Sequence, residues 1–192
     1  MIISHQLKFI FIHVQRTGGT SIVNSLKKEL GKDIEVISQH GNTQIDEENL
    51  LTKFDYYFKF GFVRNPWDRI FSWYSLVHKW DILPLDQEKV RFENFLMNYL
   101  SVSEKDDPYF HFNQLDYFKN KNGELITQRI GRFENYNDDF KSICENIRIS
   151  NIQIEKINST NLKNYRNYYS EKTQTFIAEK CKEDIEYFSY SF

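Results

Sequence analysis

The sequence contains little that would suit a disulfide-stabilised, metal-binding or membrane-spanning protein. Only two of its 192 residues are cysteine, and Cys144 and Cys181 have neither a metal-ligand spacing nor a disulfide framework. Both occupy apolar positions of helix-like segments, so we expect buried, free thiols. No apolar run reaches the roughly 18 residues that a membrane span requires. The first apolar run is interrupted by Lys8 and leads into a glycine turn, unlike a signal peptide. These absences predict a cytoplasmic protein in a reducing compartment.

An excess of charge of one sign is also missing. The chain has 25 lysines and arginines against 27 aspartates and glutamates, a net charge of −2 at pH 7. Without a basic excess the protein cannot release many counterions, which argues against general affinity for nucleic acid or for an anionic membrane. Any anion site must therefore be local, built from a few arginines and backbone N–H groups.

What the sequence does contain is typical of one compact domain with an aromatic core. Its residues are 40% hydrophobic and 27% charged, which are values of globular proteins. The aromatic share is 17%, with 17 Phe and 12 Tyr. We find no internal repeat, no low-complexity tract and no linker. We therefore expect a single domain over residues 1–192.

The order of the apolar segments predicts an α/β fold. Continuous or alternating apolar runs predict strands at residues 7–14, 34–37, 57–63 and 125–130, and a weak one at 152–157. Apolar residues at helical spacing predict helices near residues 20–30, 67–80, 88–100, 140–147 and 177–185. Because the chain opens as strand, helix, strand, we expect a P-loop-like domain with a central parallel sheet flanked by helices.

The first strand-to-helix turn has the features of an anion site. Residues 11–21 read FIHVQRTGGTS, an apolar run followed directly by Arg16, two glycines and three hydroxyl residues. A helix N-terminus presents unpaired N–H groups and about half a positive charge. Glycines let that backbone approach a phosphate or sulfate closely, and an arginine adds a full charge. A tight turn with ordinary helix capping is the alternative interpretation of this stretch taken alone.

The turn differs from the nucleoside-triphosphate P-loop, G-x-x-x-x-G-K-[ST]. The first glycine is missing, and Gly19 stands where the lysine is required. This chain therefore lacks the lysine that a P-loop kinase needs for ATP chemistry.

A second strand-to-helix turn lies at residues 62–74, FVRNPWDRIFSWY. Arg64 comes at the end of the predicted strand, where open α/β sheets place ligand contacts. Asn65 suits a helix cap and Pro66 a first helical turn. Ser72 follows two helical turns after Arg64.

Together the two turns resemble the phosphate-binding motifs of the sulfotransferase family, in its carbohydrate and Golgi-type branch with soluble bacterial relatives. Residues 11–22 are similar to the 5′-phosphosulfate loop, usually H-I-P-K-T-G-G-T-S. Residues 62–74 are similar to the 3′-phosphate segment, V-R-N-P-W-D-R-x-x-S-x-Y. Residues 131–147 and 183–192 match the branch in pattern, so the resemblance spans nearly the whole chain.

The resemblance implies transfer of a sulfuryl group from 3′-phosphoadenosine 5′-phosphosulfate (PAPS), without a metal, to a hydroxyl or amine of a carbohydrate, glycan-like or other small-molecule acceptor. Carried over by position, it assigns the 3′-phosphate to Arg64 and Ser72, and the 5′-phosphosulfate to Arg16, Thr17, Gly18, Gly19, Thr20 and Ser21. Arg16 stands where the family usually has Lys, and Gln15 where it has Pro. Arginine can neutralise the leaving oxygen but does not give up its proton.

The acceptor hydroxyl needs a general base, and histidine has a suitable pKa. His40, in SQHGNT, follows the predicted strand 34–37 and is similar to a histidine that the branch often carries between the two phosphate motifs. We therefore expect His40 to be the base, with Asp46 and Glu47 as alternatives. His13 matches the family's histidine ahead of the loop and is expected to be structural or to orient the loop.

The segment 108–118, PYFHFNQLDYF, resembles the acceptor side of the branch, so Tyr109, His111 and Gln114 are expected to contact the acceptor. Two alternatives to a sulfotransferase remain open at this point. One is a non-catalytic protein that binds PAPS or its product but has lost turnover through Arg16. The other is the P-loop kinase.

Overall fold

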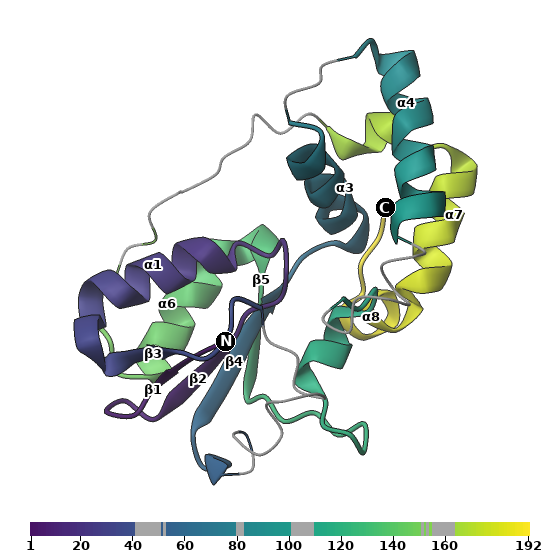
Figure 1. Cartoon of the computed structure of the whole chain (residues 1–192). Helices are drawn as coiled ribbons and strands as arrows, with labels where there is room; N and C mark the ends of the chain where they lie inside the picture. Colours follow the sequence, from purple (N-terminus) through teal and green to yellow (C-terminus); the bar gives the residue numbers. More distant parts are fainter. Residues whose placement is uncertain are drawn as a thin grey trace. The chain divides into compact units, whose positions relative to one another are not determined.

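The computed structural model describes residues 1–40, 51, 53–79, 83–100, 110–150, 152, 154 and 164–192. The chain forms two compact units, residues 1–64 with 115–159 and residues 65–114 with 160–192 (Figure 1). In chain order the elements are β1 (Ile2–Ser4), β2 (Phe9–Ile12), α1 (Gly19–Leu30), η1 (Gly31–Asp33), β3 (Ile34–Val36), β4 (Phe58–Val63), α3 (Pro66–Val77), α4 (Leu85–Asn94), η2 (Phe95–Leu100), η3 (Gln114–Phe118), β5 (Arg129–Arg132), η4 (Phe133–Asn135), α6 (Tyr136–Asn146), η5 (Tyr165–Tyr168), α7 (Glu171–Lys180) and α8 (Lys182–Phe188).

The first unit is built on a five-stranded sheet in the order β3-β1-β2-β4-β5. β2, β4 and β5 pair in parallel. β1 pairs antiparallel with both β2 and β3, so β3 runs in the same direction as β2. The α/β class and the mainly parallel sheet are confirmed. The short antiparallel strand β1 was not predicted, because three residues are too few to show a period.

Helices α1 and α6 cover one face of this sheet (Figure 1). β2 reads FIFI and is buried on both faces, as expected for a strand inside a parallel sheet. The core on the helix side consists of Ile2, Phe9, Phe11, Ile22, Leu26, Phe60, Phe62, Phe140, Ile143, Cys144, Ile147 and Ile149. The expectation of buried free thiols is confirmed for Cys144 here and for Cys181 in the second unit.

The carboxyl ends of the parallel strands meet at one edge of the sheet. The register pairs Ile12 of β2 with Gly61 of β4, and Val63 of β4 with Arg132 of β5. The chain therefore leaves β2, β4 and β5 at the same edge, and it leaves β3 there too. Open α/β sheets bind ligands at this edge.

The second unit is helical. α3 begins at Pro66 after an Asn65 cap, whose side chain accepts from the N–H groups of Trp67 and Asp68. The predicted helix at 88–100 corresponds to α4 and the π-helical segment η2, and the predicted helix at 177–185 is two helices that meet at Cys181. This unit has an aromatic-rich core that consists of Trp67, Ile70, Phe71, Tyr74, Phe92, Phe95, Leu96, Leu100, Phe110, Phe112, Tyr168, Tyr169, Ile177 and Cys181.

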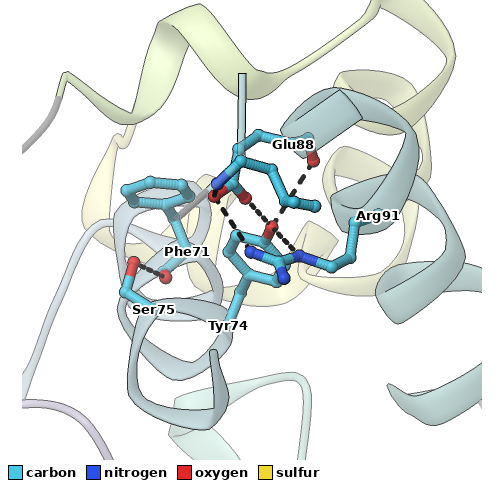
Figure 2. A network of polar contacts seen from close by, with 6 residues as sticks. Phe71, Tyr74, Ser75, Glu88 and Arg91 are labelled. Carbon is cyan, nitrogen blue, oxygen red and sulfur yellow. Dashed lines mark hydrogen bonds and ion pairs between the residues drawn. The ribbon is translucent and has the colours of Figure 1, made fainter. Parts of the chain in front are cut away.

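A buried polar network joins α3 to α4 in this unit (Figure 2). The Tyr74 hydroxyl donates to the Glu88 carboxylate, and Arg91 reaches both, at 3.0 Å from the tyrosine oxygen and 2.9 Å from the carboxylate. Burial and the contact with Glu88 raise the pKa of Tyr74 to about 12. Burial alone would raise the pKa of Glu88, but hydrogen bonds from Tyr74, Leu83 N–H and Arg91 outweigh it and lower that pKa. Glu88 is therefore a buried carboxylate held in its charged form.

Candidate functional site

The loop after β2 has an unusual backbone conformation and leads directly into the N-terminus of α1. Arg16 and Gly18 have positive φ angles of 67° and 84°, a conformation that glycine adopts readily and arginine rarely. Gly18 is the N-cap of α1 and has no side chain to occupy the first N–H groups. The first turn contains no acidic residue. The start of α1 can therefore accept an anion, with the helix dipole favouring it.

The hydroxyl residues of this loop differ in what they can offer a ligand. Thr17 is fully buried, and its hydroxyl donates to the Val14 carbonyl at 2.9 Å. Its hydroxyl proton is therefore committed within the loop, and Thr17 can serve an anion through its backbone N–H. Thr20 is exposed, whereas Ser21 is half-buried and its side chain is a hydrogen-bond partner of the Tyr136 hydroxyl.

Each of the two glycines has an aromatic ring packed against it. A Cβ on Gly18 would lie 2.8 Å from the Tyr136 hydroxyl, and one on Gly19 would lie 2.0 Å from the His13 ring. Tyr136, at the start of α6, also donates a hydrogen bond to the Gly18 carbonyl. Burial raises the pKa of Tyr136, so its hydroxyl stays protonated and able to donate. Side chains from elsewhere in the unit therefore hold both glycines of the loop.

Two arginines converge at this edge of the sheet. Arg64, at the end of β4, is 4% exposed and donates to the Arg16 carbonyl at 3.4 Å. Its guanidinium lies 4.2 Å from the centre of the Phe133 ring. Burial and the positive charge of Arg64 lower the pKa of Arg16 to about 10. Arg16 therefore keeps its charge at neutral pH, and it lies with the Arg64 guanidinium at the edge where α1 begins.

His40 and His13 also meet here. Their ring centroids are 4.8 Å apart, and His40 follows β3 at the same edge as the loop. His13 is 6% exposed. Burial, then the charge of His40, then the N-terminal ammonium lower the pKa of His13 to about 3, against a hydrogen bond to the Gln39 backbone. His13 is therefore neutral at physiological pH.

The remaining predicted site residues belong to the second unit or lie outside the described residues. Ser72 is buried in α3, 8% exposed. His111 is half-buried, and its carbonyl accepts from both terminal nitrogens of Arg69 at 3.1 Å. Gln114 is fully buried, and its side-chain amide donates to Asp184 at 2.9 Å. Tyr109 lies outside the described residues.

Arg69 is fully buried, and its guanidinium also donates to the Phe112 carbonyl at 3.0 Å. The second arginine of the motif at 62–74 thus fixes the backbone around His111 within this unit. The alternative bases Asp46 and Glu47 lie outside the described residues. The predicted site residues that the first unit brings to one edge are accordingly Arg16, Thr17, Gly18, Gly19, Thr20, Ser21, Arg64 and His40.

A comparison with protein families matches residues 1–191 to the model described as the sulfotransferase family. The chain belongs to this family. The match covers all but the last residue of the chain, and membership of the family supports sulfuryl transfer in general. A search of curated proteins and a search of solved structures each found no match.

Among the described residues, no group of three or more histidine, cysteine, aspartate or glutamate side chains is placed to hold a metal ion. No helix in the described part of the chain is both long and apolar enough to cross a membrane.

Sequence reasoning missed Tyr136 and the extent of the His13 contacts. Tyr136 is 118 residues from Gly18, and it lies in the segment 131–147 that matched the family only in pattern. Nothing in the spacing of that segment pointed to the loop. His13 was expected to orient the loop, and its contact with Gly19 agrees with that prediction.

Proposed function

We propose that this protein transfers a sulfuryl group from PAPS to a hydroxyl or amine of a carbohydrate or other small-molecule acceptor. The observation that carries the proposal is the pair of charged, repelling guanidinium groups beside the N-terminus of α1, in a member of the sulfotransferase family. Two guanidinium groups that act on each other beside a helix N-terminus suit a multiply charged anion. PAPS is such an anion.

The proposed roles of the loop follow from its donors. The backbone N–H groups at the start of α1, together with Thr20, Ser21 and Arg16, would bind the 5′-phosphosulfate. For the 3′-phosphate the support is the motif at 62–74, which assigns it to Arg64 and Ser72. The prediction that Tyr109, His111 and Gln114 contact the acceptor rests on sequence resemblance, as does the expected cytoplasmic location.

The proposed chemistry needs only groups of this chain once donor and acceptor are bound. His40 takes the proton of the acceptor hydroxyl, whose oxygen forms a bond to sulfur. The bond between sulfur and the bridging oxygen breaks, and its electron pair leaves with the phosphate. Arg16, with a pKa of about 10, stays protonated and stabilises the growing charge without giving up its proton.

One observation speaks against the P-loop kinase. Gly19 occupies the position of the lysine in the nucleoside-triphosphate motif, and the His13 ring fills the space where its side chain would begin. A lysine at this position would displace that ring. We therefore do not favour ATP-dependent phosphoryl transfer.

The experiment measures binding and turnover separately. The product 3′,5′-adenosine diphosphate (PAP) should raise the Tm of the protein at micromolar concentration, and Arg64→Ala should abolish the shift. Arg129→Ala is the matched control, because Arg129 is exposed at the opposite end of β5. No shift at millimolar PAP would contradict the proposal.

Turnover is measured as transfer of labelled sulfuryl from PAPS to a panel of glycans and small hydroxyl compounds. Transfer that His40→Ala slows by about 100-fold or more supports the enzyme. PAP binding without any transfer, with transfer restored by Arg16→Lys, would instead identify the non-catalytic relative.

A further inference from the structure

The His13 ring touches both halves of the proposed reaction centre. On one side it contacts the start of α1, since a Cβ on Gly19 would lie 2.0 Å from Cδ2 and 2.3 Å from Nε2 of the ring. On another side its centroid lies 4.8 Å from that of His40, with the rings inclined at 59°. Phe11 stacks against it with centroids 5.7 Å apart. The imidazole is thus enclosed between the anion-binding turn and the segment that carries His40.

The ring also binds the segment of His40 through a hydrogen bond. The Gln39 backbone is a hydrogen-bond partner of the imidazole, and Gln39 immediately precedes His40. The other titratable groups that act on His13 are His40 and the N-terminal ammonium. Because burial and these two groups lower its pKa to about 3, His13 does not gain or lose a proton near neutral pH. His13 can therefore contribute to the site through its contacts and not through a change of protonation.

We propose that His13 is a positioning residue that holds His40 at a fixed place relative to the anion-binding turn at Gly19. The inference rests on the proposed function, because it requires His40 to act as the base. A base must lie within hydrogen-bonding distance of the proton it removes, about 2.6–3.2 Å. A displacement of about 1 Å can lower the rate by roughly 100-fold. A rigid neutral ring in contact with both groups prevents such a displacement.

The test is a double-mutant cycle with His13→Phe, His40→Ala and the double variant, assayed for sulfuryl transfer from PAPS and for PAP binding. Phenylalanine keeps a planar ring against Gly19 and Phe11 but loses the hydrogen bond to Gln39. We expect His13→Phe to lower kcat by at least about tenfold, with the PAP Kd changed by less than about threefold. In the His40→Ala background the same substitution should have no further effect on kcat, because there is no base left to position.

Equal losses of kcat on His13→Phe in both backgrounds would overturn the inference and leave a structural role only. Wild-type kcat in His13→Phe would overturn it too. If His40→Ala retains full transfer, the inference fails because His40 is not the base, while PAP binding still tests the donor site independently. His13→Gln, which keeps an N–H donor, should recover part of the kcat lost in His13→Phe, and it serves as the second variant if His13→Phe does not fold.

Discussion

Replacing Tyr136 by phenylalanine removes one hydroxyl from beneath the anion-binding turn and leaves the ring in place. The hydroxyl donates to the Gly18 carbonyl, while the ring packs against Gly18 and, with centroids 5.2 Å apart, against Phe62. Phenylalanine can keep the packing contacts. The Ile22 backbone and the Ser21 side chain are also hydrogen-bond partners of this hydroxyl. The substitution therefore removes the polar contacts that tie α6 to the start of α1.

The expected loss follows from what remains for the Gly18 carbonyl. An intramolecular hydrogen bond contributes about 0.5–1.5 kcal/mol, and a buried group left unsatisfied costs about 1–3 kcal/mol. The Gly18 carbonyl also accepts from the Ser21 N–H at 3.0 Å, so it keeps one partner in the variant. The Ile22 backbone and the Ser21 side chain lose a partner as well, so the loss should be about 1–3 kcal/mol. For a chain of this size each kcal/mol corresponds to a fall in Tm of about 2–4 °C.

Thermal unfolding of the variant and of a matched control measures this loss. Tyr187→Phe is the control, since Tyr187 is 58% exposed on α8, and its free energy of unfolding should change by less than about 0.5 kcal/mol. If Tyr136→Phe and Tyr187→Phe have the same Tm, the hydrogen bond does not stabilise the turn and the reasoning is refuted.

Three further predictions concern the turn, the network between α3 and α4, and the charge of the ligand. Gly19→Ala should lower the free energy of unfolding, because overpacking against His13 costs about 1–3 kcal/mol. The better helix propensity of alanine offsets at most about 1 kcal/mol of this cost. A Tm equal to that of the wild type would contradict the prediction. Because the folded-state pKa of Glu88 is lowered, its carboxylate stabilises the fold above its ordinary pKa of about 4.3 and loses this effect as the pH falls below it. Thermal melts from pH 6 to 3 should show a shallower fall in Tm for Glu88→Gln than for wild type, and parallel curves would exclude the effect. PAP binding should weaken as salt rises from about 0.05 to 0.5 M, because ions screen the partly exposed phosphate contacts, whereas adenosine binding should not; titration calorimetry separates the two.

The sequence was sufficient for features that short segments specify. The apolar runs at β2 and β4, the cap at Asn65 and the start of a helix at Pro66 each depend on residues within a few positions of one another. Helical and extended periods are visible over such lengths. Boundaries were less accurate: the strand predicted at 125–130 is β5 at Arg129–Arg132, where pairing with Phe60 and its neighbours sets the start. Ile152 and Ile154, expected in a strand, lie in none.

Part of the candidate site could be predicted in the same way. Arg16, the glycines and Arg64 follow strands that the apolar runs predict, and the rule for parallel sheets places such residues at one edge. His40 was expected at a strand end, and the structure brings its ring to His13. Two hydrogen bonds could not be predicted, the one from the Thr17 hydroxyl to the Val14 carbonyl and the one from the Gln114 amide to Asp184. Both depend on the local path of the backbone and on burial.

The sequence by itself determined the α/β class, the two strand-to-helix turns and the family, because these are encoded in local period, in glycine and proline positions and in long contiguous motifs. Only the tertiary structure decided that β1 enters the sheet antiparallel between β2 and β3, that Tyr136 supports Gly18, and that His13 lies between Gly19 and His40. These contacts join residues far apart in the chain. They depend on strand order and on register, where a shift of one residue would turn each side chain to the other face of the sheet.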